Sequence, residues 1–310
     1  MNPDRDRGIW RWWVYQKERF PLVQHGPLIF AFSFSAVAFV WMLRSSAGWP
    51  NLLSVVVAFG SCLIFFLQLR IADEFKDNDE DTRYRPYRPV PRGLVTLRDL
   101  AGLFVLGAIV QVGLALWLDA RLLILLLITW TYQALMGKEF FLGEWLRGKH
   151  LTYMVTHMAI MPLVDLYATS TDWLAFQGHP PAGLFWFLLA SLFNGMVIEI
   201  GRKIRSPEDE EEGVPTYSVV WGRRRALGTW WLVMGLTLVY ACIAVRRIDF
   251  FVPLVIILGL FLGGAVFVGT HFMRRQTKGA GKWIENWSGV WTLVLYLSLG
   301  PVPLFLRELG

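Results

Sequence analysis

Residues 51–81 read NLLSVVVAFGSCLIFFLQLRIADEFKDNDED and pass from an apolar run directly into three evenly spaced aspartates. The run 51–71 is long enough to cross a bilayer as a helix, because about 20 apolar residues span a hydrocarbon core of roughly 30 Å. Asp73, Asp77 and Asp81 follow at intervals of four residues. On a helix, this spacing places three carboxylates along one face. The stretch therefore predicts a membrane helix that ends in an acidic motif.

Similar apolar runs recur along the whole chain. Of its 310 residues, 55% are hydrophobic and only 17% are charged, whereas soluble domains carry about a quarter charged residues. We therefore expect an all-α integral membrane protein, with about nine transmembrane helices in a bundle around a central pocket. The expected spans are 27–43, 51–71, 99–118, 120–136, 151–169, 183–200, 226–245, 249–270 and 287–306.

The basic residues indicate the topology of the nine spans. If the N-terminus is cytoplasmic, the cytoplasmic segments hold 24 of the 30 Lys and Arg residues, and the opposite segments hold five. Positive charge concentrates on the cytoplasmic side of membrane proteins, so we expect the N-terminus inside and the C-terminus outside. The net charge of +6 is explained by these helix ends, and we predict no nucleic-acid partner.

Two parts of the chain differ in composition. Residues 1–26 are polar and basic, with several Trp residues among the charges. That mixture is typical of a cytoplasmic or interfacial segment at the lipid headgroups, although an ordered N-terminal tail is equally compatible with it. Residues 27–310 form the expected single transmembrane domain, with motif loops at 70–98 and 199–225.

The three aspartates repel one another unless a cation lies between them. Mg²⁺ prefers a few carboxylates together with phosphate oxygens and water, so Asp73, Asp77 and Asp81 are candidate metal ligands. Glu74, Asp79 and Glu80 fall off the common face, and we expect them to be solvated loop charges. An acidic loop followed by arginines that only set the topology explains the spacing equally well.

A second acidic stretch follows the sixth expected span. Residues 194–222 read NGMVIEIGRKIRSPEDEEEGVPTYSVVWG, and Glu199 and Lys203 lie one helical turn apart. Pro207 ends or kinks the helix, so the acids at 208–212 need not continue the face of Glu199. Such a run is more often a solvated loop than a metal site. Glu199 differs, because an ionisable group on an apolar helix is a functional candidate.

Basic residues follow both stretches and suit a diphosphate, which arginine binds through charge-assisted hydrogen bonds. The pattern suggests two similar helical halves that hold one diphosphate between two carboxylate sets. The candidate diphosphate-binding residues are Arg70, Arg85, Arg88, Arg92, Lys138, Arg202 and Lys203.

At this point the chain resembles the UbiA superfamily of intramembrane prenyltransferases over nearly its whole length. Asp73, Asp77 and Asp81 are similar to its first aspartate-rich motif, N/D-xxx-D-xxx-D, and residues 88–93 (RPVPRG) resemble the R-P-x-P-x-G segment that follows. Gly213, Thr216 and Gly222 resemble the segment after the second motif.

The chain departs from the family pattern at several positions. Position 73 is Asp where many members have Asn, and Glu199 stands at the place of the first Asp of the second motif. In the Y-x-x-x-K element after the fourth span, Tyr132 is present but Met136 stands at the Lys position, with Lys138 two residues on. These departures bear on the metal ligands of the second motif and on the choice of substrates.

The resemblance implies a prenyl diphosphate donor, a Mg²⁺ cofactor and transfer of the isoprenoid chain to a lipophilic acceptor. The implied metal ligands are Asp73, Asp77, Asp81, Glu199, Glu208, Asp209 and Glu212, and the catalytic set is Asp73, Asp77, Asp81, Glu199 and Lys203. His157 and Asn194 are expected near the acceptor pocket or between helices. The family likeness places the protein in a bacterial inner membrane, with its active site open to the cytoplasm.

Two other functions remain open. A terpene cyclase or isoprenoid elongase on the same scaffold would use the same Mg²⁺–diphosphate chemistry without this acceptor. A membrane cation transporter is more distant, because it needs acidic groups near the bilayer midplane, whereas these acids lie at helix ends.

Overall fold

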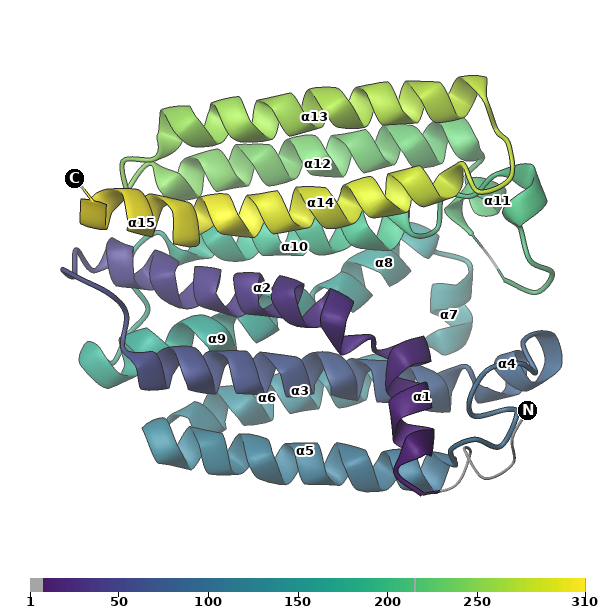
Figure 1. The fold of residues 1–310 in the computed structure, drawn as a ribbon, viewed down its shortest axis with the longest axis horizontal. Coiled ribbons are helices and arrows are strands. Elements are labelled where there is room, and N and C mark those ends of the chain that lie inside the picture. Colours follow the sequence, from purple (N-terminus) through teal and green to yellow (C-terminus); the bar gives the residue numbers. More distant parts are fainter. Residues whose placement is uncertain (1–7, 215, 310) are drawn as a thin grey trace.

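A computed structural model describes residues 8–214 and 216–309, and every regular element in those ranges is a helix. Most of the long helices run side by side along the longest axis of the molecule (Figure 1). The fold is therefore the expected all-α bundle, and its core is assembled from the faces that these helices turn toward one another.

Seven helices within the described residues are long and apolar enough to cross a membrane. Each corresponds to one of the expected spans, because an uninterrupted apolar sequence satisfies its backbone hydrogen bonds within the helix. They are α2 (Leu22–Leu43), α3 (Leu52–Lys76), α5 (Leu97–Leu118), α10 (Leu184–Gly201), α12 (Arg223–Val245), α13 (Phe251–Arg274), and α14 (Gly281–Leu299) continued by α15 (Pro301–Leu309).

The two remaining expected spans are shorter or divided. The segment 120–136 forms the 16-residue helix α6 (Leu122–Gly137). The segment 151–169 falls on α8 (His150–Met158) and α9 (Ile160–Phe176), which are separated at Ala159. Pro162 has no N–H to donate to the carbonyl of Met158, which accounts for the break at this position. The total of nine spans stays a prediction.

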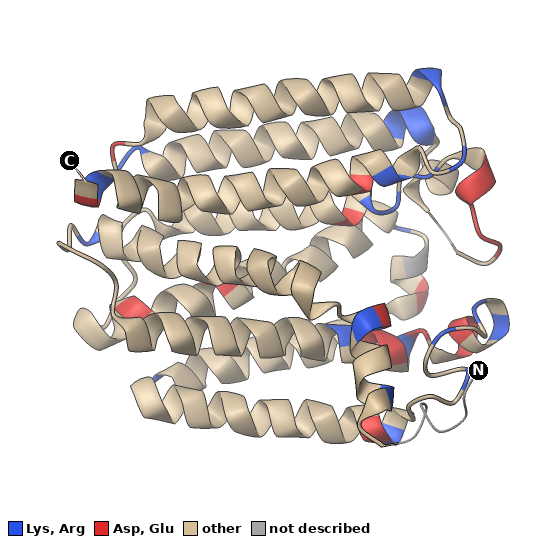
Figure 2. Ribbon diagram, in the orientation of Figure 1, with Lys and Arg blue, Asp and Glu red and all other residues tan. Residues whose placement is uncertain are grey.

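The charged residues gather at one end of the bundle, called here the charged end (Figure 2). The short elements there are α4 (Asn78–Tyr84), η1 (Glu139–Phe141), α7 (Gly143–Arg147), η2 (Pro207–Asp209) and α11 (Tyr217–Val220). Helix α1 (Trp10–Arg19) lies across this end, whereas α15 lies at the opposite end (Figure 1).

Helix α1 is anchored to the bundle by one buried aromatic residue. Tyr15 packs in a small core with Ile71 and Leu100, while Trp10 and Trp13 are 57% and 58% exposed. Exposed Trp beside basic residues suits the headgroup layer of a bilayer. Helix α2 begins at Leu22, before the expected domain boundary at residue 27, and the division into 1–26 and 27–310 stays a prediction.

Small residues bring the central helices close together. A Cβ added at Gly201 of α10 would lie 2.0 Å from the Ser288 hydroxyl of α14, and one at Gly300 would lie 2.5 Å from the Ser35 Cα of α2. Small residues at such crossings are the usual device of membrane helix packing. They fix α14 between α10 and α2, and so set the positions of the ends of these helices.

An ion pair fixes the end of the bundle opposite the charged end. Arg44, after α2, donates to both carboxylate oxygens of Asp172 of α9 at 2.8 and 2.9 Å. The Asp172 side chain is fully buried and that of Arg44 is 11% exposed. The guanidinium also lies over the Phe176 ring, 4.6 Å from its centroid.

Removal of this pair predicts a loss of stability. Asp172→Ala leaves the Arg44 guanidinium buried and unpaired, so we expect the free energy of unfolding to fall by about 3–5 kcal/mol. Glu285→Ala is the matched control, because its partner Lys282 is 66% exposed and exposed pairs contribute under about 1 kcal/mol. Thermal unfolding in nanodiscs measures both variants. Equal thermal midpoints for the two variants would contradict a stabilising role of the Arg44–Asp172 pair.

Candidate active site

The first acidic motif lies where α3 ends and α4 begins, at the charged end. The motif does not continue one uninterrupted helix, because Asp77 is at once the C-cap of α3 and the residue before α4. The backbone still steps by four residues, with Asp77 N–H donating to Asp73 C=O at 2.9 Å and Asp81 N–H to Asp77 C=O at 2.8 Å. The predicted spacing is thus kept across a bend at Asp77.

Asp81 is buried and held by two arginines. Its carboxylate accepts from Arg85 at 3.0 Å and from Arg88 at 2.5 Å, and its side chain is 3% exposed. Two guanidinium groups compensate the burial of one carboxylate. Arg85 and Arg88, both predicted to bind a diphosphate, therefore lie directly on the motif.

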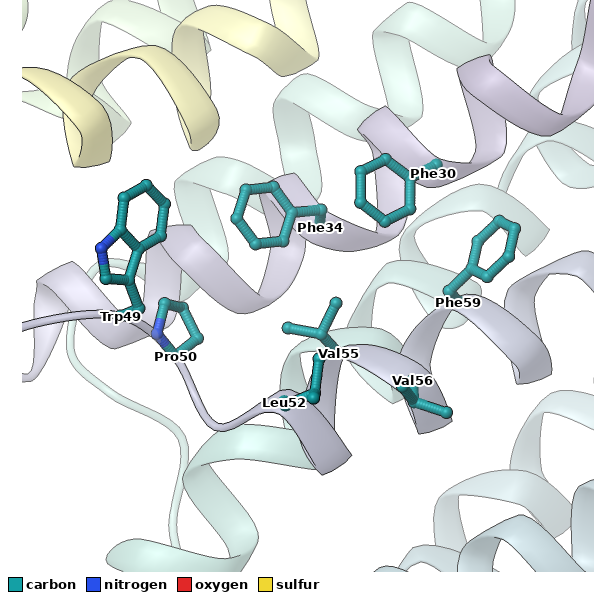
Figure 3. A pocket seen from close by; sticks show the side chains of 8 residues that line it. All are labelled: Phe30, Phe34, Trp49, Pro50, Leu52, Val55, Val56 and Phe59. Atoms are coloured by element: carbon teal, nitrogen blue, oxygen red, sulfur yellow. The ribbon is translucent and has the colours of Figure 1, made fainter.

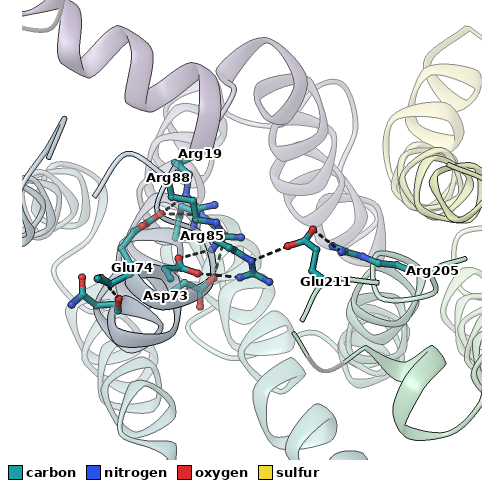
Figure 4. A network of polar contacts seen from close by, with 11 residues as sticks. Arg19, Asp73, Glu74, Arg85, Arg88, Arg205 and Glu211 are labelled. Carbon is teal, nitrogen blue, oxygen red and sulfur yellow. Dashed lines mark hydrogen bonds and ion pairs between the residues drawn. The ribbon is translucent and has the colours of Figure 1, made fainter. Parts of the chain in front are cut away.

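Glu74 corrects one expectation of the sequence analysis. It is not a solvated loop charge, because its carboxylate is 1% exposed and pairs with Arg19 of α1 and, at 3.8 Å, with Arg70 (Figure 4). Arg19 was missed as a member of this region, since it lies 55 residues away in the sequence. The amphipathic pattern of residues 9–20 is the signal that could have suggested it.

Arg92 also contacts the N-terminal helix. It donates to both carboxylate oxygens of Glu18 at 3.0 and 2.9 Å, and to the Tyr87 carbonyl at 2.9 Å. The two bonds to Glu18 hold the loop that carries Arg92 against α1, and the third bond lies within that loop. In this arrangement the Arg92 side chain extends to α1 rather than toward the three aspartates of the first motif.

Asp77 is the member of the motif that carries no compensating contact. Its carboxylate has no ion pair or side-chain hydrogen bond with the side chains that the structure describes, whereas Asp73 lies 3.4 Å from Arg70. Burial raises the pKa of Asp77, and the charges of Asp73 and Asp81 raise it further. Lys76 only partly opposes this rise. A cation placed beside Asp77 would relieve the repulsion.

The second acidic motif begins at the last turn of α10. Glu199 has a side chain that is 7% exposed, and it pairs with Lys203 at 2.8 Å and with Arg202 at 2.6 Å. One carboxylate thus pairs with two cations, which leaves a net positive charge at this end of α10. Lys203 Nζ also lies 5.5 Å from the centroid of the Tyr217 ring.

The acids after Pro207 do not gather around Glu199. The Asp209 carboxylate accepts from the Gly279 N–H at 2.7 Å, which ties the loop to the segment before α14. Glu208 and Glu212 are exposed. Within the described residues, no group of three or more His, Cys, Asp or Glu side chains is arranged to hold a metal ion. The ligand roles of these three acids stay predictions.

Glu211 joins the two motifs (Figure 4). Its carboxylate accepts from Arg205 at 3.0 Å and from Arg85 at 3.2 Å. Burial acts to raise the pKa of Glu211, but the bonds from these arginines outweigh it and lower the pKa. Nearby, a Cβ at Gly213 would meet the Tyr84 ring at 2.6 Å, and φ at Gly213 is +74°. The two motif loops therefore lie directly against each other.

The other predicted site residues lie in different surroundings. Lys138 is exposed after α6 and makes no ion pair in the described part of the chain. Asn194 is fully buried and accepts from the Thr292 hydroxyl of α14 at 3.2 Å. His157 of α8 is half-buried, and its ring stacks on Tyr153 with centroids 3.8 Å apart.

An apolar groove of about 430 Å³ lies between α2 and α3, near the loop that joins them at the opposite end (Figure 3). Its walls include Phe30, Phe34 and Phe59, and none of its lining residues is charged. Such a surface suits hydrocarbon but supplies no acid, base or ligand. The candidate catalytic groups therefore lie at the charged end and not in this groove.

Comparison with solved structures identifies the same fold. A UbiA homologue from Aeropyrum pernix K1 superposes with a TM-score of 0.67 at 13% identity, covering 90% of this chain and 97% of that one. A structure described as digeranylgeranylglyceryl phosphate synthase in membranes gives a TM-score of 0.59 at 15% identity, covering 90% and 96%. These identities show likeness of fold alone.

The sequence itself matches a family model. No curated protein matches the chain significantly. The model of the UbiA prenyltransferase family, however, matches residues 31–290, which include both acidic motifs. This protein therefore belongs to the UbiA prenyltransferase family of integral membrane proteins.

Proposed function

We propose that this protein is a Mg²⁺-dependent intramembrane prenyltransferase, which transfers an isoprenoid chain from a prenyl diphosphate to a lipophilic acceptor and releases diphosphate. The observation that carries the proposal is the junction of two acidic motifs at one end of an apolar bundle, through Arg85 between Asp81 and Glu211. A polyanion bound there would have its apolar tail beside the membrane-spanning helices.

Asp73 and Asp77 are the residues that fit a divalent cation best. Asp77 is uncompensated and its pKa is raised by its acidic neighbours, so a cation would be bound with relief of repulsion. Mg²⁺ uses one or two carboxylates and fills its other positions with phosphate oxygens and water. These two carboxylates therefore suffice once Arg70 leaves Asp73, and Asp81 and Glu199 would join only after exchanging their present basic partners.

The basic residues would bind the diphosphate by the same exchange. Arg85 and Arg88 now lie on Asp81, and Arg202 and Lys203 lie on Glu199. A diphosphate offers these cations charge-assisted, often bidentate hydrogen bonds. Arg70, 3.4 Å from Asp73, is placed to join them, whereas Arg92 would act indirectly by holding the loop on α1.

The reaction follows from charge stabilisation at the leaving group. The allylic C–O bond breaks with its electron pair on the diphosphate, and the acceptor then forms a bond to the allylic carbon and loses a proton, which the released diphosphate takes up. A bound Mg²⁺ supplies Lewis-acid stabilisation of the departing oxygens. The apolar helices exclude water that would otherwise capture the cation. Asn194, buried between α10 and α14, is the proposed acceptor-side residue, whereas the contact of His157 with Lys76 places that ring beside the first motif.

We further propose that the charged end faces the cytoplasm, in a bacterial inner membrane. Most Lys and Arg residues of the chain lie in the segments assigned to that side, as the positive-inside rule requires. The diphosphate donor would then enter from the aqueous side, and the acceptor from the bilayer.

The first prediction concerns turnover. Protein in nanodiscs should release diphosphate from a prenyl diphosphate of suitable length only with Mg²⁺ and a membrane-lipid extract as the source of acceptor. Asp77→Asn should abolish release, because it removes a metal ligand. The control Asp79→Asn should leave release unchanged, because Asp79 is exposed beside the motif. A labelled donor and mass spectrometry identify the product.

Other outcomes of the same assay separate the alternatives. Mg²⁺-dependent release without extract would favour a cyclase or an elongase. Absence of release with every donor length, from folded protein, would contradict the enzymatic proposal.

The second prediction uses the raised pKa of Asp77. A carboxyl group whose pKa is raised in the folded state destabilises that state once pH exceeds the raised pKa, because ionisation then lowers the free energy of the unfolded chain more than that of the folded chain. Without metal, Asp77→Asn should therefore raise the thermal midpoint at pH 7, and the gain should shrink toward pH 4. Mg²⁺ should raise the midpoint of the wild type more than that of Asp77→Asn. A thermal midpoint of Asp77→Asn below that of the wild type at pH 7 would contradict electrostatic repulsion at Asp77.

A further inference from the structure

A cluster of polar and aromatic side chains surrounds Lys76, which lies between Asp73 and Asp77 in the first motif. The Lys76 ammonium donates to the Tyr153 hydroxyl and lies 3.0 Å from the Glu139 carboxylate and 3.5 Å from His157 Nε2. Three acceptors thus face the three N–H bonds of one lysine. Of these residues, only His157 was predicted from the sequence to be a site residue.

The hydrogen bonds define the tautomer of His157. Its Nδ1 lies 2.9 Å from the Tyr153 carbonyl oxygen, which can only accept, so Nδ1 carries the proton and Nε2 presents its lone pair to Lys76. The nearby ammonium opposes a second proton on this ring. His157 is therefore a hydrogen-bond acceptor that orients Lys76, and it is not placed to serve as a base.

The Tyr153 hydroxyl is left with a proton to donate. Its oxygen accepts from Lys76, and its O–H has no acceptor among residues 8–214 and 216–309. An oxygen that accepts from a cation becomes a stronger donor, because hydrogen bonds in series polarise one another. The ring cannot turn away freely, since it stacks on His157 at 3.8 Å with an interplanar angle of 17°.

An unusual turn positions the carboxylate of the cluster. Glu139, Phe140 and Phe141 have φ of 49°, 56° and 59°, a left-handed conformation that residues with a side chain rarely adopt and that concentrates at functional sites. The Phe140 ring also packs edge-on against His157 at 6.1 Å. A Cβ at Gly143 would lie 2.4 Å from Glu139 Oε2, so glycine leaves room for this carboxylate.

The cluster lies between the two acidic motifs. Helix α8, which carries Tyr153 and His157, packs against α10, which carries Glu199. Asp77 is near enough for its charge to act on the Tyr153 phenol, and Glu199 acts likewise on His157. Tyr153 therefore lies close to Asp77, in the region where the proposed function places the diphosphate.

We propose that the Tyr153 hydroxyl, polarised by Lys76, donates a hydrogen bond to the diphosphate oxygen that gains charge when the allylic C–O bond breaks. The electron pair of that bond passes to the oxygen, and no proton is transferred. This inference rests on the proposed function. It makes Tyr153 a catalytic residue, and Lys76, Glu139 and His157 positioning residues that act through it.

Charge favours this assignment over contact with the acceptor. Lys76 and Glu139 neutralise each other at 3.0 Å, so the cluster does not add another cation to the arginine-rich site. It adds one oriented donor where negative charge develops, which is the arrangement that lowers a barrier rather than tightening ground-state binding.

Tyr153→Phe tests the proposal, because it removes the hydroxyl and keeps the stacked ring. Tyr240→Phe is the matched control, since the Tyr240 ring of α12 stacks on Phe193 and its hydroxyl makes no hydrogen bond with the described residues. Turnover is measured at saturating donor and acceptor. Affinity for inorganic diphosphate with Mg²⁺, and for an unreactive prenyl thiolodiphosphate, is measured by competition in nanodiscs.

We expect Tyr153→Phe to lower kcat about 100-fold and to weaken inorganic diphosphate binding about tenfold, with affinity for the thiolodiphosphate changed by less than about threefold. Lys76→Gln should change the same quantities in the same direction by a smaller factor. Tyr240→Phe should leave all of them near wild type.

The inference is overturned if Tyr153→Phe matches Tyr240→Phe, or if it raises only the KM of the acceptor. Absence of wild-type turnover with every donor would instead contradict the proposed function. In that case the inorganic diphosphate measurement still decides whether Tyr153 contacts the anion. Should Tyr153→Phe fail to fold, Lys76→Gln provides the same comparison.

Discussion

The Arg85 guanidinium, shared by Asp81 and Glu211, is the contact on which the organisation of the charged end depends. It joins a loop after α3 to a loop after α10, two segments 126 residues apart. Helices that are apolar over most of their length gain little from the hydrophobic effect when they associate in lipid. Polar contacts at their ends therefore have a large share in deciding which helix ends meet.

The membrane explains why so much of the fold could be predicted. An apolar run must satisfy its backbone within itself, so the residues of α2, α3 and α13 specify helices almost without regard to their neighbours. The exceptions have local causes that are visible in the chain. Pro162 divides the fifth expected span, and Pro301 begins a separate last helix after Gly300.

The site was less accessible to sequence reasoning, because an ion pair depends on distance in space. The spacing of Asp73, Asp77 and Asp81 indicated an acidic motif, but nothing local distinguished buried Glu74 from exposed Glu80. The partner of Glu74, Arg19, comes from a helix before the first span. Lys76 was likewise invisible as a site residue, since its contacts come from η1 and α8.

The two ends of the bundle differ in the kind of ion pair they contain. At the far end, Arg44 and Asp172 are buried with few competitors for their charges. At the charged end, arginines meet carboxylates beside water, where a substrate anion or a metal cation can take the place of either partner. Resistance to lateral separation is therefore unequal along the helices. We expect the helices to separate laterally more easily at the charged end than at the Arg44–Asp172 end. A lipid-borne molecule would then enter the bundle where the charges can change partners.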